Sequence, residues 1–212
     1  MRKWIPLALI VIALIVSIAV YPQLPDRIPT HWNTAGEVNG WSSRFWGAWM
    51  LPLVMAVVWF IMRAIPHIDP RKANYEKFEG MYDWLVILVI AFMLVMHVAI
   101  IMSATGSHVS IHTVVMPSVG IFIAILGLLL PKVHPNWFVG IRTPWTLTSD
   151  LSWERTHKIG GVLFVVLGLL IVATTVLDPP TAIWVLVIAA LAIILFLFAY
   201  SYQVWKEDPS KR

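Results

Sequence analysis

The sequence predicts an all-α integral membrane protein, a bundle of about six transmembrane helices. Its 212 residues are 59% hydrophobic and 12% charged, with a mean hydropathy of +0.82; soluble domains carry about twice that charged share. The apolar residues form long uncharged runs, each close to the roughly 20 residues that cross a bilayer. The Lys and Arg residues lie almost entirely between these runs. Together these observations indicate lipid rather than water as the solvent.

The first uncharged run follows Arg2 and Lys3, and its apolar part ends near Tyr21. A cleaved signal peptide is the alternative interpretation, because Ser17-Ile18-Ala19 resembles a small-x-small cleavage site. The apolar core is long for a signal peptide and further spans follow. These two points favour an uncleaved first helix.

Five further spans are expected along the chain. The second runs from Phe45 to Met62, contains Pro52 as an expected kink and closes at Arg63. The stretch between Asp83 and Lys132 has no charged residue and is too long for one crossing, so it predicts two helices separated near Gly106. The spans after the second are predicted at 84–102, 109–130, 159–177 and 182–204, the last two joined by a turn at 178–181.

The distribution of basic residues predicts the orientation. Apart from Arg27 and Arg44, every Lys and Arg lies in or beside alternate segments, as expected for cytoplasmic loops. Both termini are therefore expected in the cytoplasm of a multi-pass protein. The expected organisation is helices 1–2 within 1–63 with an outer loop at 22–44, a cytoplasmic loop at 64–83, helices 3–4 within 84–130, a cytoplasmic loop at 131–158, helices 5–6 within 159–205, and a cytoplasmic tail at 206–212.

Charge and cysteine content narrow the function classes. The net charge is +4 and the isoelectric point is near 9.5, yet the basic residues form no stripe, so direct nucleic-acid binding is not expected. The chain has no Cys. Disulfides, thiolate metal sites and cysteine nucleophiles are therefore excluded.

The outer loop is too particular in composition to be a simple connector. Its prolines restrict the backbone, and Asn39-Gly40 is a strong tight-turn signal, so a small hairpin or compact cap is expected. His31, Trp32 and Trp41 offer stacking faces and hydrogen bonds to a peptide or a lipid headgroup. The alternative is an aromatic belt at the membrane interface.

The cytoplasmic loop 131–158 is also rich in anchoring residues. Thr148, Ser149 or Asp150 is expected to cap a helix that continues into the fifth span and places Trp153 and His157 on one face. The structural alternative has the loop's aromatic side chains in the headgroup layer and Arg142 on a lipid phosphate or a helix C-terminus.

Both loops resemble the SdpI family of bacterial membrane immunity proteins, and the order of the segments and the helix count agree with that family. The outer segment carries Pro25, Ile28, Pro29, His31, Trp32, Asn33, Gly36, Gly40 and Trp41, and looks like the family's N-terminal domain of unknown function. The inner segment carries Asn136, Gly140, Arg142, Thr143, Pro144, Trp145, Thr146, Leu147, Ser149, Trp153, Thr156 and His157, and is similar to the family's C-terminal signature.

The resemblance implies a non-enzymatic protein without cofactors in a bacterial cell membrane, where it protects the cell from a secreted, membrane-active peptide toxin. Toxin or ligand recognition is then expected in the outer motif from Pro29 to Trp41. The inner motif from Asn136 to His157 is expected to signal, by holding a small winged-helix autorepressor at the membrane. Membrane lipids are the remaining expected partner.

An enzyme or metal site has little support in the sequence. None of the seven His residues belongs to an HExxH motif. His108 and His112 have helical i, i+4 spacing, and His31 with Glu37 is another conceivable metal pair, but neither pair identifies a bound metal.

Two non-immunity functions remain as alternatives. A small-molecule or ion transporter could be built from two inverted halves of three helices, with His97 alone in the third run. However, no Asp, Glu, Lys or Arg lies within the six runs, and His97 is also expected to hydrogen-bond simply to Ser103, Thr105 or a neighbouring helix. A lipid-organising protein would use Gly120, Gly127 and Gly168 for helix packing alone.

Overall fold

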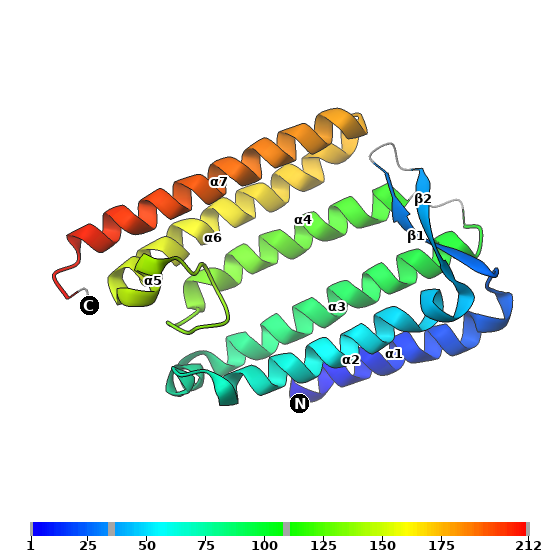
Figure 1. The fold of residues 1–212 in the computed structure, drawn as a ribbon, viewed down its shortest axis with the longest axis horizontal. Helices are drawn as coiled ribbons and strands as arrows, with labels where there is room; N and C mark the ends of the chain where they lie inside the picture. The colour runs from blue at the N-terminus through cyan, green and yellow to red at the C-terminus, as the bar shows by residue number, and fades with distance from the viewer. Residues whose placement is uncertain (1, 34–36, 108–110, 211–212) are drawn as a thin grey trace.

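The computed structural model describes residues 2–33, 37–107 and 111–210. Six helices within this part of the chain are long and apolar enough to cross a membrane, which confirms the predicted fold class. Figure 1 shows these helices side by side, with a small β-hairpin at one end of the bundle and the start of the first helix and the end of the last at the other. We call these the hairpin end and the loop end, the latter also carrying the irregular loop 133–143.

The spanning helices are α1 (Ile5–Val20), α2 (Arg44–Ile68), α3 (Glu79–Ala104), α4 (Ile111–Leu129), α6 (Asp150–Ala173) and α7 (Pro179–Glu207). Short 3-10 turns extend or join them: η1 (Arg2–Trp4), η2 (Tyr21–Gln23), η3 (Lys72–Phe78), η4 (Leu130–Lys132) and η5 (Thr174–Val176). The hairpin strands are β1 (Arg27–Trp32) and β2 (Val38–Ser43), and the short helix α5 (Pro144–Thr148) precedes α6.

Several helices run beyond the apolar runs that predicted them. Helix α2 continues through Pro52 and past Arg63 to Ile68, so the connector 64–83 is helical for most of its length. Arg63 does not end the helix because its guanidinium donates to Asp83 Oδ1 at 2.7 Å and to the Lys3 carbonyl at 3.2 Å. A charged residue with these partners marks the edge of the apolar segment but leaves the helix intact.

The helices form two groups, α1–α2–α3 and α4–α6–α7, joined by contacts between α3 and α4. Helices α4 and α6 pack backbone against backbone. A Cβ atom added at Gly168 would lie 2.4 Å from the Gly120 carbonyl oxygen, and one added at Gly127 would lie 2.6 Å from the Gly161 carbonyl oxygen. Such close approach is how small residues hold helices together in lipid, where apolar side chains gain nothing by leaving the solvent.

A buried polar contact ties the first three helices together. Ser17 of α1 donates to the Ala48 carbonyl of α2 at 2.7 Å, and its oxygen lies 3.0 Å from Nε2 of His97 in α3. Because the hydroxyl proton is directed to Ala48, Nε2 of His97 is the donor to Ser17. His97 therefore hydrogen-bonds to a neighbouring helix, as one of the two sequence interpretations expected.

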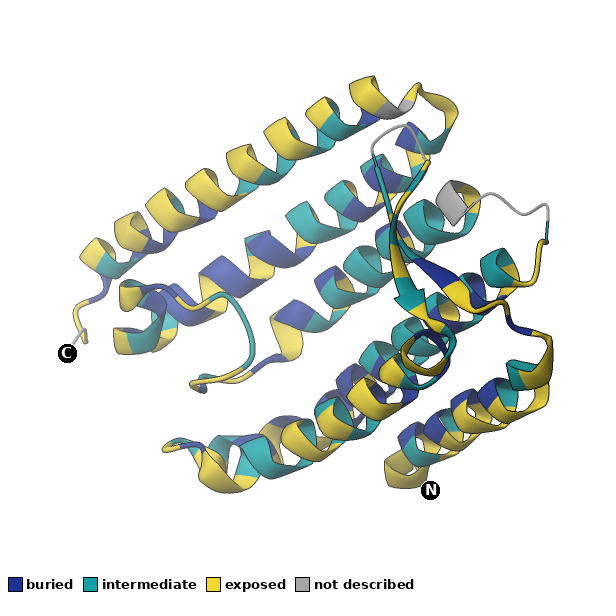
Figure 2. Ribbon diagram, turned by 45° about the vertical axis from the view of Figure 1, so that its right-hand side comes forward, coloured by how far each residue is buried: buried dark blue, intermediate teal, exposed yellow. Residues whose placement is uncertain are grey.

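The outward faces of the bundle are apolar and exposed, as Figure 2 shows most clearly along α7. Trp184, Ile188 and Leu195 of this helix are each more than half exposed. A water-soluble protein would rarely present so much contiguous apolar surface. These faces are suited to lipid acyl chains.

The α4–α6 contact predicts that Gly168→Ala destabilises the protein by about 1–3 kcal/mol, because the new methyl group meets backbone atoms that cannot move aside. Gly80→Ala is the matched control, since its Cβ would meet only the flexible Arg2 side chain at 3.5 Å. Thermal unfolding of both variants in detergent measures the difference. Equal or greater stability of Gly168→Ala relative to the control would show that the contact is not tightly packed.

Candidate functional site

The hairpin expected in the outer loop is present, but its turn is not at Asn39-Gly40. Strand β1 pairs antiparallel with β2, Pro29 opposite Trp41 and His31 opposite Gly40, with irregular register around His31. Asn39 and Gly40 instead lie within β2, where both contact His31. A Cβ at position 40 would lie 2.7 Å from His31 Cβ, and the Asn39 side-chain oxygen bonds to His31 Nδ1 at 2.5 Å.

One face of the hairpin is fixed to the helices. Ile28 is fully buried and packs against Gly47 of α2, in a cluster that includes Leu24, Ala48 and Ile101. Arg44, the first residue of α2, donates its backbone N–H to the Asp26 carbonyl at 3.0 Å and its guanidinium to the Asp26 carboxylate at 2.6 Å. The hairpin is thereby held on the end of α2.

Part of the hairpin is open to solvent, and we call its exposed side chains Arg27, His31 and Trp41 the open hairpin face. His31 is exposed, Trp41 is 51% exposed, and the Arg27 guanidinium lies over the Trp41 ring at 5.8 Å from its centre. This face presents an aromatic ring, an imidazole and a cation within one small rigid element. It is suited to binding a peptide or a headgroup.

The remaining outer-motif residues have different environments. Pro29 is buried, and Trp32 and Asn33 are half-buried. The Asn33 side chain hydrogen-bonds to the backbone N–H and to the carboxylate of Glu37, whereas His31 hydrogen-bonds to Asn39. His31 and Glu37, the conceivable metal pair, therefore have different partners. Gly36 and His108 lie outside the described residues.

At the loop end, Asn136 organises the irregular segment 133–143. Its side chain is completely buried. Its nitrogen donates to the His134 and Val139 carbonyls, both at 2.9 Å, and its oxygen accepts from the Phe138 and Val139 N–H groups at 2.8 and 2.6 Å. One amide thus supplies the partners that a strand or helix would otherwise provide to this backbone.

Two residues outside the signature join this loop to α2, and the sequence interpretation missed both. Asp69, 2% exposed, accepts from the Trp137 N–H and from the Tyr75 hydroxyl, each at 2.9 Å, and Tyr75 also donates to Asn136 at 3.3 Å. Asp69 precedes Pro70 at the end of α2, a combination that signals a helix terminus but not a partner in a distant loop.

His157 supports the same loop from α6. Its Nδ1 lies 2.8 Å from the Trp153 carbonyl and its Nε2 lies 2.9 Å from the Ile141 N–H, so the ring is the neutral tautomer with the proton on Nδ1. The ring stacks on Trp153, with centres 4.1 Å apart. Gly140 has a φ of +118°, and a Cβ there would lie 2.3 Å from His157 Nε2, so both conformation and space require glycine.

The threonine-rich part of the signature caps α5. Thr143 Oγ1 accepts from the Thr146 N–H at 3.1 Å, and Thr146 Oγ1 accepts from the Thr143 N–H at 2.9 Å, a reciprocal capping box. Pro144 occupies the first helical position, where its missing N–H costs nothing. Leu147 lies partly buried against the main hydrophobic core.

The signature also attaches α7 to the loop. Thr143 donates to Ser201 at 3.0 Å, and Trp145 packs on Phe198 with ring centres 4.6 Å apart. Ser149 caps α6 through the Ser152 N–H at 2.9 Å, as expected, and it also donates to the Asp208 carboxylate. These contacts explain most of the signature as an internal brace.

Arg142 is the signature residue most available to a partner. Its side chain is exposed and donates to the Trp137 carbonyl at 2.6 Å, so it neither caps a helix nor enters the core. Trp137 and Phe138 beside it are 46% and 39% exposed. Arg142, Trp137 and Phe138 form the open surface of the loop.

The comparisons with known proteins agree with this division. Residues 8–56, which include the hairpin, match the model of a domain of unknown function, DUF1648, and residues 132–202, which include the loop and most of α7, match the model of the SdpI/YfhL protein family. A relative named immunity protein SdpI, from Bacillus subtilis (strain 168), is 24% identical over 206 residues, covering 97% of each chain. No solved structure matches the chain significantly.

The Asn136 contacts predict that Asn136→Asp destabilises the protein by about 3 kcal/mol, because a carboxylate cannot donate to the two carbonyls and is itself buried. Asn39→Asp is the control, since it is exposed and keeps its acceptor for His31, and its effect should stay within about 0.5 kcal/mol. Thermal unfolding and limited proteolysis within 133–143 measure the difference. Equal behaviour of the two variants would remove Asn136 as the organiser of the loop.

Proposed function

Because the chain belongs to the SdpI/YfhL family and carries an N-terminal DUF1648 segment, we propose that it is an immunity protein that protects a bacterium from a secreted, membrane-active peptide. The likeness to an immunity protein along 97% of its length supports this function. The carrying observation is that the hairpin is fixed to the helices by the buried Ile28 and still exposes His31 and Trp41.

In this proposal the hairpin lies outside the cell and the loop end lies in the cytoplasm. The hairpin carries Arg27 and the start of α2 carries Arg44, whereas the other basic residues of the described chain gather at the loop end. The excess of Lys and Arg on one side supports placing that side inside. Both termini are then cytoplasmic.

The toxin binds the open hairpin face. A tryptophan ring with a guanidinium above it offers a peptide both apolar contact and a polar edge, and such groups dominate protein interfaces. Binding to a rigid surface loses little conformational entropy, and the hairpin is held by the contacts of Ile28 and Arg44. The protein acts by binding, without catalysis and without a cofactor.

A second, cytoplasmic role belongs to the open loop surface. Arg142, Trp137 and Phe138 stand on a segment that Asn136 holds in one conformation. This surface suits docking of a protein such as a winged-helix autorepressor, which would report toxin binding to transcription. Transport is less favoured, because the six apolar runs contain no Asp, Glu, Lys or Arg that could couple an ion.

Protection should depend on the open hairpin face. In a bacterium sensitive to an SDP-type peptide toxin, His31→Ala and Trp41→Ala should each lower the toxin concentration that the cells survive by about tenfold, the effect of losing one central interface residue. Trp184→Ala is the control, because Trp184 is an exposed tryptophan at the start of α7. Survival is compared at matched protein abundance.

Two results would contradict this assignment. Unchanged protection by both hairpin variants would exclude recognition at that face, and no protection by the folded natural chain would exclude immunity to this toxin.

The loop surface should affect signalling and not survival. Arg142→Ala should keep protection within about twofold while reducing co-purification of the autorepressor with the membrane, because the side chain of Arg142 is exposed and its hydrogen bond within the described chain is to the Trp137 carbonyl. Arg155→Ala, at an exposed ion pair with Glu207, is the matched control. Loss of protection in Arg142→Ala at normal abundance would show that the two surfaces do not have separate roles.

A further inference from the structure

The two helix groups leave an open space between them near the loop end. We call the contact between α3 and α4 that joins the groups the seam. A pocket of about 190 Å³ lies in it, to which α3 contributes Met81 and Leu85, α4 contributes Leu126 and Leu129, and α6 contributes Phe164. Side chains of both groups therefore line one small cavity.

The seam is closed by side chains farther along the same helices. Phe92 of α3 stacks on Phe122 of α4, with ring centres 4.5 Å apart. Phe92 follows Leu85 by seven residues, which is about 10 Å along a helix axis. The groups are thus in contact toward the middle of the bundle, and the space between them is confined to its loop end.

The wall of this seam pocket is apolar. None of the described residues that line it has a polar side chain, and Gly140 contributes only backbone. A cavity of ~150 Å³ lined by Leu, Ile and Phe stays dry in water and takes up apolar molecules. The seam pocket is therefore suited to hydrocarbon and not to water or a polar ligand.

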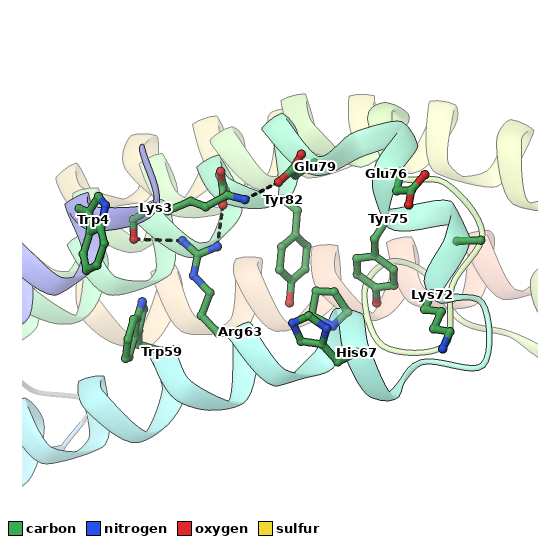
Figure 3. A pocket seen from close by; sticks show the side chains of 13 residues that line it. Lys3, Trp4, Trp59, Arg63, His67, Lys72, Tyr75, Glu76, Glu79 and Tyr82 are labelled. Carbon is green, nitrogen blue, oxygen red and sulfur yellow. Dashed lines mark hydrogen bonds and ion pairs between the residues drawn. The ribbon is translucent and has the colours of Figure 1, made fainter. Parts of the chain in front are cut away.

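The larger pocket at the loop end has a different chemistry (Figure 3). It has a volume of about 880 Å³, and its lining includes the ion pairs Lys3–Glu79 and Arg63–Asp83. A hydrocarbon chain in that pocket would lie against charged groups, which is unfavourable. Of these two pockets, the seam pocket is the one that suits a hydrocarbon chain.

The bilayer supplies hydrocarbon at this position. The three helices that line the pocket are among those long and apolar enough to span a membrane. Leu128, which lies between Leu126 and Leu129 in sequence, is 62% exposed, and Trp84, next to Leu85, is 49% exposed. These side chains suit contact with lipid, so lipid chains are expected beside the lining residues.

Filling the pocket with lipid is also energetically favourable. An empty space deprives the lining atoms of dispersion contacts. Lipid chains are as apolar as leucine, so a chain that enters loses nothing by leaving its surroundings. Leu126, Leu129 and Phe164 are only partly buried, so the pocket is not filled by the protein's own side chains.

We propose that one acyl chain of a phospholipid, from the leaflet on the loop side, occupies the seam pocket. The chain contacts α3 on one side of the seam and α4 and α6 on the other, and so joins the two helix groups. It also meets Gly140 and Ile141 of the signature loop, where the Ile141 N–H donates to His157 at 2.9 Å. The site is separate from the open hairpin face and from the Arg142 surface, and it goes beyond the proposed immunity function.

Photo-cross-linking of the purified full chain tests the site in vesicles of phosphatidylcholine that carries a diazirine in one acyl chain. Peptide mass spectrometry then locates the adducts. Leu85 should be labelled although it is only 7% exposed, whereas Ile90, fully buried in the same helix and outside the pocket, should not be. Equal labelling of Leu85 and Ile90 would overturn the site.

Two substitutions at one lining residue change the size of the pocket in opposite directions. Leu126→Phe should fill it and remove the labelling of Leu85, whereas Leu126→Ala should enlarge it and increase that labelling. Leu128→Phe, on the exposed face of the same helix, is the matched control and should leave the labelling of Leu85 unchanged.

Two outcomes for these variants would contradict the proposal. One is unchanged labelling of Leu85 in both Leu126 variants. The other is a joint rise at Leu85 and Ile90 in Leu126→Ala, because that would report loosening of the fold rather than entry of a chain into the pocket. The vesicles contain no toxin, so these results are independent of the protection assay.

Discussion

A hydrocarbon interior offers no hydrogen-bond partner to a peptide group, and this constraint determines where everything except helix lies in this molecule. The hairpin and the irregular loop 133–143 are at opposite ends of the bundle. At the loop end part of the backbone is also shielded from water, because one side of the segment packs against η3, α6 and α7. The buried Asn136 amide bonds four backbone groups of the loop, and Asp69 accepts a further N–H.

Whether the sequence predicted a feature depends on how far apart along the chain its interacting residues lie. Helix count, the hairpin and the Ser149 cap depend on hydropathy, prolines and side chains within a few residues of one another, so local patterns predict them. The extension of α2 past Arg63 was missed because its partner Asp83 lies twenty positions away. The ties from Asp69 to Trp137 and from Ser149 to Asp208 span 68 and 59 positions, and no local pattern contains them.

The tryptophans show why a single structural explanation for the aromatic residues is insufficient. Trp153 is core, stacked on His157 and bonded to the Val133 carbonyl, and Trp145 packs on α7. Trp41 and Trp137 remain exposed at opposite ends. The inner signature is therefore mainly structural, since most of its side chains make contacts within the chain. Partner choice is left to the few side chains that remain open.

Helix α2 is the element that meets both ends of this arrangement. Its first residue, Arg44, holds the hairpin through Asp26, and the residue after its end, Asp69, holds the loop through Trp137. Contact alone does not transmit a signal. Transmission needs an element with two arrangements, whose equilibrium is shifted by binding at either site. Helix α2 continues unbroken through Pro52 and Pro66. A displacement at the hairpin would thus reach the loop by movement of the whole helix against α1 and α3, and the Ser17–His97 contact, which binds all three helices together, would resist it.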